Sequence, residues 1–438
     1  MNSQFSLFKR GGFLAFFTAQ FLGAYNDNFA KSLYGVLLAY GLWDLAGARP
    51  ELLVSLAAAV FIFPFILFTP FAGFLADRYD KTKIIIWTKI AELLIVFVAI
   101  TALYTHSLPL AFFSLFALGT QTAFFSPCKF SILPQHIEDN ELIAGNALIG
   151  AGTYIAVLMG TMMGAFIAPL AWGNALGALI LLAVALIGIF SAFRMKAAPA
   201  SDMAKDVGLS FFKHYFSVWK IIFKQRLLVI MSIFATSWFY FFAAGFHAQF
   251  PNFTSQTLGA DPHVLSLLMV IFSVGIALGG LLNHSLLKGE NDIRFVCFAA
   301  LAIAFLGGDL YWASVHFPKL AEGAMYEPLG FFTNIYGLRV TFDLVCMAIA
   351  AGVFIIPLRS VVQAYTALEV RARVVSGSNM LDAIFILLSA IIAMVMFSFD
   401  YKVEHFYIFV SSFTGVVGVM VFIGLKLCAM ANGTKGDR

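Results

Sequence analysis

The chain has 438 residues, of which 61% are hydrophobic and 11% are Asp, Glu, Lys or Arg. Soluble globular proteins carry about 25% charged and about 45–50% apolar residues, so this composition excludes a soluble domain. The four cysteines form neither CxxC pairs nor a metal-ligand spacing, and the net charge of +4 comes from dispersed basic residues. A disulfide scaffold, a metal site and a nucleic-acid partner are therefore not expected.

Apolar segments long enough to cross a membrane recur along the whole chain. A membrane-spanning helix needs about 20 predominantly apolar residues. Twelve segments satisfy this in chain order: residues 12–40, 52–76, 84–104, 108–125, 142–168, 172–193, 227–250, 264–287, 295–315, 340–358, 376–399 and 406–427. A cleavable signal peptide is not expected, because Lys9 and Arg10 precede a long first segment that itself contains charges.

Basic residues concentrate in alternate connections between these segments. If the N-terminus is cytoplasmic, most of the 27 basic residues fall on the cytoplasmic side. The outer connections then contain only Arg49, Lys319, Arg339 and Lys402. Cytoplasmic loops collect Lys and Arg, so both termini are predicted to be cytoplasmic.

The longest inner connection, residues 194–226, divides the chain into two six-helix halves, residues 1–193 and 227–438. Within this connection, Leu209 to Gln225 sets four aromatic residues at helical spacing with three lysines between them. This pattern predicts an amphipathic helix on the anionic inner leaflet, and a plain tether is the alternative.

The two halves repeat a short pattern. Lys129 and Arg359 each follow a proline by two residues, and each precedes an asparagine that opens a helix, Asn146 and Asn379 respectively. Weak similarity between six-helix halves is typical of alternating-access transporters. Lys129 and Arg359 are thus predicted at equivalent inner positions, as gating residues or phosphate contacts; topology and lipid anchoring also explain them.

The most specific motif, GFLADRYDKTK, occupies residues 73–83 between the second and third segments. It resembles the signature loop GxxxDRxGRK of the major facilitator superfamily. The predicted gating residues here are Gly73, Asp77, Arg78, Lys81 and Lys83. Gly73 is expected to allow close helix approach, and Asp77 to accept hydrogen bonds from a helix end or an arginine. Asp80 stands where the superfamily usually has glycine, so the turn is expected to differ.

Two further stretches narrow the family. AQFLGAYNDN at residues 19–28, and FSPCKFSILP at residues 125–134 followed by AGN at 144–146, resemble bacterial lysophospholipid transporters. They also resemble the transporter-like domain fused to acyltransferase and acyl-carrier-protein ligase domains. The resemblance implies an all-α major facilitator fold in the bacterial inner membrane. It also implies that lysophospholipid, chiefly lysophosphatidylethanolamine, is flipped to the cytoplasmic leaflet for reacylation.

Asp27 is the main candidate for substrate handling. It lies in the middle of the first segment, where an ionised carboxylate costs at least a few kcal/mol unless it faces water or a partner. Asn26 and Asn28 flank it, and Lys31 follows one turn later. We expect these four residues to bind the headgroup. The alternative is a structural Asp27–Lys31 ion pair on one helix face.

Two candidate residues lie in the second half. Lysophospholipid transporters tend to carry an arginine in the seventh helix where this chain has His247. Histidine can lose its charge near neutral pH, so an Asp27–His247 pair would be proton-sensitive; a satisfied histidine near a helix end is the alternative. Asp382 is a candidate gate or headgroup contact, unless it caps a helix or pairs with Arg371 or Arg373.

Smaller features complete the interpretation. Lys89 and Glu92 are expected to form a structural pair near the inner face. Small residues at four-residue spacing in the fifth segment predict close approach of another helix, as at a sliding interface between halves. They are Gly152, Ala156, Gly160, Gly164 and Ala168. Ala165 replaces the proline usual in drug/proton antiporters, which weighs against that class. The aromatic residues around the seventh segment could line an acyl-tail groove, although most are expected to face lipid.

Other functions have less support. A histidine five residues before an acid, His136 and Glu141, is the only acyltransferase-like spacing, and no P-loop is present. We therefore expect a monomeric transporter without catalytic residues, metal or cofactor, whose partners are an amphiphile and membrane lipids. One alternative is a proton-coupled transporter of a soluble metabolite, siderophore or drug. Another is a non-transporting membrane partner of a cytoplasmic acyltransferase.

Overall fold

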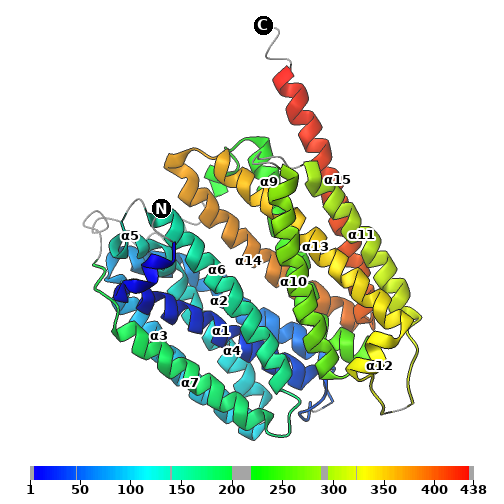
Figure 1. The fold of residues 1–438 in the computed structure, drawn as a ribbon. Helices are drawn as coiled ribbons and strands as arrows, with labels where there is room; N and C mark the ends of the chain where they lie inside the picture. Colours follow the sequence, from blue (N-terminus) through cyan, green and yellow to red (C-terminus); the bar gives the residue numbers. More distant parts are fainter. Residues whose placement is uncertain are drawn as a thin grey trace. The chain divides into compact units, whose positions relative to one another are not determined.

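Twelve helices of at least 21 residues dominate the computed structural model (Figure 1). It describes residues 4–45, 47–138, 141–199, 219–287, 294–321 and 323–433. Eleven of the long helices have the length and composition to cross a membrane. The other, α1, is 29 residues long and contains the polar run Asn26 to Asn28. Twelve spans and cytoplasmic termini stay predictions.

The chain divides into two compact units. Unit 1 comprises Met1–Ala48 and Ala57–Phe212, and unit 2 comprises Arg49–Leu56 and Lys213–Arg438. Helix α2 (Pro50–Arg78) begins in unit 2 and continues in unit 1. The other helices of unit 1 are η1 (Gln4–Lys9), α1 (Gly11–Ala39), α3 (Lys81–Thr105), α4 (Leu108–Ser131), α5 (Leu133–His136), α6 (Leu142–Ile167) and α7 (Gly173–Phe193).

Unit 2 contains the other helices of the described residues, coloured green to red in Figure 1. They are α9 (Leu227–Asn252), the π turn η4 (Phe253–Thr257), α10 (Pro262–Leu287), α11 (Arg294–Val315), α12 (Pro328–Thr333), α13 (Ile335–Ala364), α14 (Leu368–Ser398) and α15 (Val403–Gly433). Most of the predicted amphipathic helix lies outside the described residues. Its helical residues 219–222 include Ile222, which is fully buried in an apolar cluster with α9, α13 and α14.

Polar side chains cap the first turns of two helices. The carboxylate of Asp80 caps α3 by accepting hydrogen bonds from the backbone N–H groups of Thr82 and Lys83. Asn334 caps α13 in the same way by accepting from the N–H of Tyr336 at 2.8 Å. Such caps satisfy N–H groups that have no partner within the helix, and unpaired groups are costly near hydrocarbon.

Small residues of α6 bring its backbone against α1. A Cβ atom at Gly160 would lie 2.4 Å from the carbonyl oxygen of Tyr25, and one at Gly164 would lie 2.6 Å from that of Phe29. Gly152 faces the ring of Phe17, which also lies on α1. The predicted close approach is confirmed. These three glycines pack on α1 within unit 1. A sliding interface between halves stays a prediction.

We expect Gly160→Ala to lower the free energy of unfolding by about 1–3 kcal/mol, because the new methyl group meets backbone atoms that cannot rotate away. Gly150→Ala is the matched control on the same helix, since a Cβ there meets nothing within 4 Å. It should be neutral or stabilising, because alanine favours helices over glycine. Thermal unfolding of both purified variants in detergent checks this, and equal melting temperatures would contradict it.

Candidate functional site

Asp27 lies near the middle of α1 and is 3% exposed. Its carboxylate accepts hydrogen bonds from Thr122 Oγ1 at 2.6 Å and from Gln121 Nε2 at 3.4 Å, both on α4. An ionised carboxylate has about four acceptor positions, so Asp27 retains acceptor capacity. The neighbouring Asn26 does too, because its buried Oδ1 has no partner among the described residues.

A buried ion pair lies beside this carboxylate. Lys89 Nζ donates to Glu92 Oε2 at 2.6 Å on α3, and both residues are 1% exposed. Asn26 Nδ2 donates to Glu92 Oε1 at 3.1 Å, which joins the pair to α1. Gly23 leaves space for the lysine, since a Cβ there would lie 2.4 Å from Lys89 Nζ. The predicted Lys89–Glu92 pair is confirmed.

The ammonium group of Lys31 contacts an aromatic ring rather than the Asp27 carboxylate. Its Nζ lies 4.3 Å from the centre of the Phe61 ring on α2, a cation–π contact. Within the described part of the chain, no salt bridge within 4.0 Å joins Lys31 to Asp27, and the two charges attract each other only at longer range. The structural alternative of an Asp27–Lys31 pair is therefore seen only as this weaker attraction. The Asn28 amide donates to the carbonyl of Ala24 at 2.7 Å within α1.

The cluster in unit 1 therefore consists of the carboxylates of Asp27 on α1 and Glu92 on α3, together with amide and hydroxyl groups from α1 and α4. Lys89 satisfies one oxygen of Glu92, and the free acceptors are on Asp27 and Asn26. Chemically, these acceptors suit an ammonium group or another hydrogen-bond donor.

Lys129 connects three helices in unit 1. Its Nζ donates to Thr153 Oγ1 on α6, and that hydroxyl lies 3.0 Å from Gln20 Oε1 on α1. Gln20 is 2% exposed, and its Nε2 has no partner among the described residues. This row of polar groups thus runs from α4 through α6 to α1.

Arg359 connects the corresponding helices of unit 2. Its guanidinium donates to Asp382 Oδ2 at 2.9 Å and to Asn379 Oδ1 at 3.0 Å on α14, and to the Tyr240 hydroxyl at 3.0 Å on α9. Ser237 Oγ donates to the other Asp382 oxygen at 2.7 Å. Asp382 thus pairs with Arg359. The side chains of the alternative partners, Arg371 and Arg373, lie outside the described residues.

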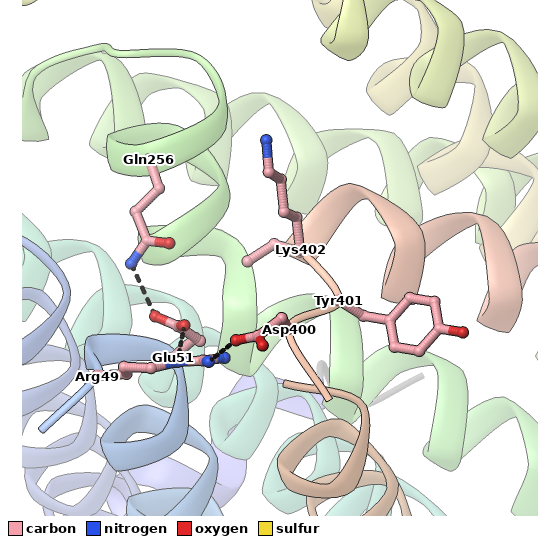
Figure 2. Close-up of a pocket in the computed structure, with 7 residues that line it drawn as sticks. Arg49, Glu51, Gln256, Asp400, Tyr401 and Lys402 are labelled. Carbon is pink, nitrogen blue, oxygen red and sulfur yellow. Dashed lines mark hydrogen bonds and ion pairs between the residues drawn. The ribbon is translucent and has the colours of Figure 1, made fainter. Parts of the chain in front are cut away.

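Unit 2 also contains a polar pocket around the start of α2 (Figure 2). Arg49 Nε donates to Glu51 Oε1 at 2.8 Å, and the guanidinium also donates to Asp400 between α14 and α15. The pocket has a volume of about 190 Å³ and is lined by Arg49, Glu51, Gln256, Asp400, Tyr401, Lys402 and Val403. Its two carboxylates are bonded to Arg49, so the pocket is internally paired.

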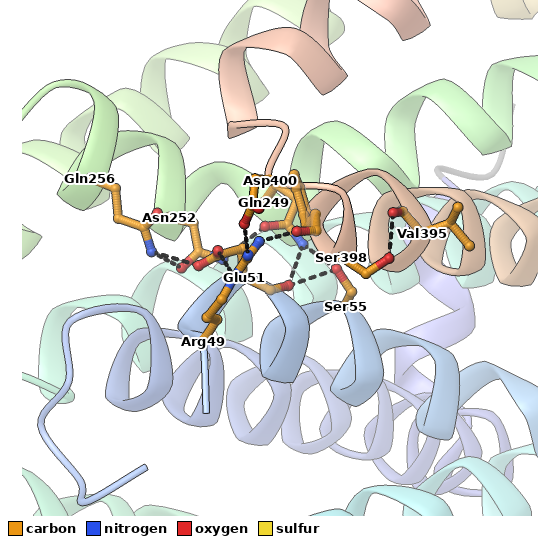
Figure 3. A network of polar contacts seen from close by, with 10 residues as sticks. Arg49, Glu51, Ser55, Gln249, Asn252, Gln256, Val395, Ser398 and Asp400 are labelled. Atoms are coloured by element: carbon orange, nitrogen blue, oxygen red, sulfur yellow. Dashed lines mark hydrogen bonds and ion pairs between the residues drawn. The ribbon is translucent and has the colours of Figure 1, made fainter. Parts of the chain in front are cut away.

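The same network extends along α9 (Figure 3). Gln249 Nε2 donates to Ser55 Oγ at 2.7 Å, Asn252 Nδ2 donates to Gln249 Oε1 at 2.7 Å, and Gln256 Nε2 donates to Glu51 Oε2 at 3.2 Å. These bonds hold the first two turns of α2 to unit 2. No functional role was predicted for any residue of this pocket and network; Arg49 and Lys402 counted only toward topology.

Residues 11–315, well over half of the chain, match the family model described as Major Facilitator Superfamily. The chain belongs to the major facilitator superfamily. It is a multi-pass membrane transporter of the bacterial inner membrane.

Several curated relatives within the superfamily are lysophospholipid transporters. The chain is 30% identical over 183 residues to the lysophospholipid transporter LplT of Cronobacter sakazakii, covering 42% of this chain and 43% of that protein. It is 29% identical over 170 residues to LplT of Photorhabdus laumondii, covering 39% of each. The matches thus span less than half of these relatives' length. A solved nucleoside transporter, NupG, has the same fold with a TM-score of 0.68 at 12% identity, covering 94% of this chain and 99% of that one.

The superfamily loop at residues 73–83 is anchored within unit 1. The N–H of Lys81 donates to the carbonyl of Ala198 at 2.9 Å, and Thr82 Oγ1 donates to that of Lys196 at 2.6 Å. The guanidinium carbon of Arg78 lies 5.8 Å from the centre of the Phe74 ring. The side chain of Lys83 is exposed. Among the described residues, no atom lies within 4 Å of a Cβ at Gly73, and close helix approach at this glycine stays a prediction. The Asp77 side chain lies outside the described residues.

His247 lies on α9 and is exposed. Because it belongs to unit 2 and Asp27 to unit 1, their pairing stays a prediction. Sequence reasoning missed Gln121, Thr122 and Glu92 as companions of Asp27. A weak signal existed for Glu92, which is a second carboxylate inside a predicted span.

His136 ends α5, outside the membrane-spanning helices, and lies against Gly12 and Lys196. Burial lowers the pKa of His136, whereas histidine in an unfolded chain titrates near 6.5. Protonation therefore favours the unfolded chain, and stability should fall as pH drops below about 6.5. We expect His136→Gln to reduce the fall in melting temperature between about pH 7.5 and 5.5. The exposed His316→Gln should keep the wild-type slope; equal slopes in all three proteins would contradict this.

Proposed function

We propose that this transporter flips lysophospholipid, of the lysophosphatidylethanolamine type, toward the cytoplasmic leaflet by alternating access. The observation that carries the proposal is the buried Asp27 cluster in a chain whose relatives are lysophospholipid transporters. The headgroup of such a lipid has an ammonium group, which needs acceptors, and a phosphate, which needs donors.

In this proposal Asp27 and Asn26 receive the ammonium group. The Asp27 carboxylate accepts hydrogen bonds from Thr122 and Gln121 and has room for more. Asn26 Oδ1 has no partner among the described residues, so it can also accept a hydrogen bond from the headgroup. Lys31 and Lys129 supply cationic groups in the same unit for the phosphate, and Asn28 supports the polar stretch of α1. His247 and Asp382 are proposed contacts in unit 2, with Arg359 and the 73–83 loop acting as gates.

Reconstituted vesicles test the substrate class. Fluorescent lysophosphatidylethanolamine is added to the outer leaflet, and the fraction protected from extraction by albumin is followed over time. We expect protein-containing vesicles to flip it at least about tenfold faster than empty vesicles, a difference of about 1.4 kcal/mol in barrier. Glycerophosphoethanolamine, the same headgroup without an acyl chain, should not be transported. No acceleration for the lipid, or transport of the soluble headgroup alone, would overturn the proposal.

A further inference from the structure

A groove with mainly apolar walls runs between α14 and α15 in unit 2, and it contains none of the proposed substrate or gating residues. Its volume is about 510 Å³, within the range of about 300–1,000 Å³ that small-molecule sites have. Ile392 and Met396 line it from α14, and Ile408, Phe409 and Phe413 line it from α15. The ring centres of Phe409 and Phe413 lie 4.8 Å apart, so the two rings form one aromatic wall.

The groove follows one face of α15 through most of one leaflet. Its α15 residues recur every three or four positions, which places them on one face of the helix. They are His405, Ile408, Phe409, Ser412 and Phe413. From His405 to Phe413 the helix rises about 12 Å, at about 1.5 Å per residue. One leaflet contributes about 15 Å of hydrocarbon, and both helices contain candidate membrane spans. The groove therefore has the length to hold an acyl chain within one leaflet.

Apolar walls alone do not select a ligand in a membrane. Lipid tails are as apolar as leucine, so an acyl chain gains little by leaving its neighbours for the groove. A preference must come from polar groups at the end of the groove. Tyr401 and His405 line that end, and Tyr401 also lines the adjacent polar pocket together with Lys402.

These polar groups are hydrogen-bond donors. His405 Nδ1 accepts from the backbone N–H of Lys402 at 3.2 Å, which leaves the ring proton on Nε2 as a donor. The ring of His405 lies 5.8 Å from that of Tyr401 and 5.6 Å from that of Tyr311, between centres. Within the described residues, the Tyr401 hydroxyl and the Lys402 ammonium form no hydrogen bond or ion pair. Both side chains extend away from the ion pairs of Arg49 (Figure 2).

We propose that this groove binds a diacyl phospholipid of the outer leaflet, with one acyl chain along α15 and its phosphate against Tyr401, Lys402 and His405. A phosphate offers several acceptor oxygens and a negative charge, and its hydrogen bond with an ammonium group is charge-assisted. The neighbouring carboxylate of Asp400 is paired with Arg49, so it does not cancel the charge of Lys402.

The depth of the donors agrees with this occupant. Tyrosine is enriched at the level of the lipid headgroups, where its ring meets hydrocarbon and its hydroxyl meets polar groups. Tyr401 lies in the connection between the two helices, and that connection is predicted to be outer. The second acyl chain stays in the bilayer, so the groove needs to hold only one. The inference does not depend on which substrate is carried.

Native mass spectrometry of the full-length purified protein tests the proposal. Dioleoyl phosphatidylglycerol is added to delipidated protein in detergent, and dioleoylglycerol, which has the same chains but no phosphate, is the control ligand. We expect wild type to retain one phosphatidylglycerol at least about tenfold more tightly than dioleoylglycerol, because only the phosphate can accept from the three donors. Equal retention of the two lipids would overturn the proposal.

Two variants test the two parts of the site separately. Tyr401→Phe with Lys402→Gln removes two donors and keeps the walls, whereas Ser412→Phe fills the groove and keeps the donors. Each should weaken phosphatidylglycerol binding by at least about fivefold. The control is Tyr365→Phe with Lys426→Gln, the same changes at exposed residues elsewhere in unit 2, which should bind as wild type does. Wild-type binding by either test variant would overturn the proposal.

Thermal unfolding and the oligomeric state complete the test. Phosphatidylglycerol should raise the melting temperature of wild type and of the control more than that of the two test variants, because a ligand stabilises the state that binds it. If Ser412→Phe does not fold, Ser412→Leu replaces it in both experiments. Equal shifts in all proteins would overturn the proposal. A wild-type dimer that Ser412→Phe converts to a monomer would also overturn it, because a second copy would then occupy the groove.

Discussion

Replacing Lys89 by methionine is expected to lower the free energy of unfolding by about 3–5 kcal/mol. Lys89 is the partner of Glu92 in a pair of which each member is 1% exposed. Without it, the Glu92 carboxylate would stay buried with the Asn26 amide as its one donor among the described residues, and it would repel the Asp27 carboxylate on α1. Denaturation of the purified protein in detergent measures the loss.

A double variant separates the lost charge from the lost volume. Lys89→Met combined with Glu92→Gln removes both charges, and the glutamine can still accept from Asn26. We expect it to regain most of the stability, because the cost of breaking a buried pair comes mainly from the charge left behind. A single variant within about 1 kcal/mol of wild type, or a double variant as unstable as the single one, would contradict this account.

Arg359→Met is expected to cause a loss of similar size, about 3–5 kcal/mol. Arg359 bonds to Asp382, Asn379 and Tyr240, and the Asp382 side chain is only 6% exposed. Arg359→Lys should fall between wild type and Arg359→Met, because a lysine ammonium keeps the charge but lacks the planar fork. Denaturation in detergent ranks the three proteins.

Transport measurements then test the proposed gating role of Arg359. Arg359→Met with Asp382→Asn should regain stability, since no buried charge is left unpaired. If Arg359 acts as a gate, this stable double variant should still flip lysophospholipid slowly. Recovery of both stability and flipping would assign Arg359 a purely structural role.

Sequence patterns predicted the helices because membrane crossing fixes their length and apolar composition. The sixth segment was predicted at residues 172–193 and is Gly173–Phe193. The tenth was predicted to begin at residue 340 but begins at Ile335. The difference arises because Arg339 reads as a loop residue, whereas its pairing with Asp309 allows it inside the helix.

The candidate site could be predicted only in part. Asp27 is conspicuous because a charge within a span is costly, and spacing offered Lys31 as an alternative partner. The actual donors are Gln121 and Thr122, which are neutral residues on α4. Placing a neutral polar residue in a membrane span costs little free energy compared with a charged one. The presence of Gln121 and Thr122 in the sequence therefore does not indicate that they contact Asp27. Which face of α4 meets α1 follows from packing, and no local pattern specifies it.

The most direct measurement of the central claim is the flipping rate of Asp27→Asn in vesicles. Asparagine keeps the size of the side chain and can still accept from Thr122, but it loses the charge that would hold an ammonium group. A lost charge-assisted hydrogen bond of about 1.5–3 kcal/mol predicts flipping of lysophosphatidylethanolamine slowed by about 10- to 100-fold, at wild-type melting temperature. Unchanged flipping by this variant would contradict the role of the Asp27 cluster.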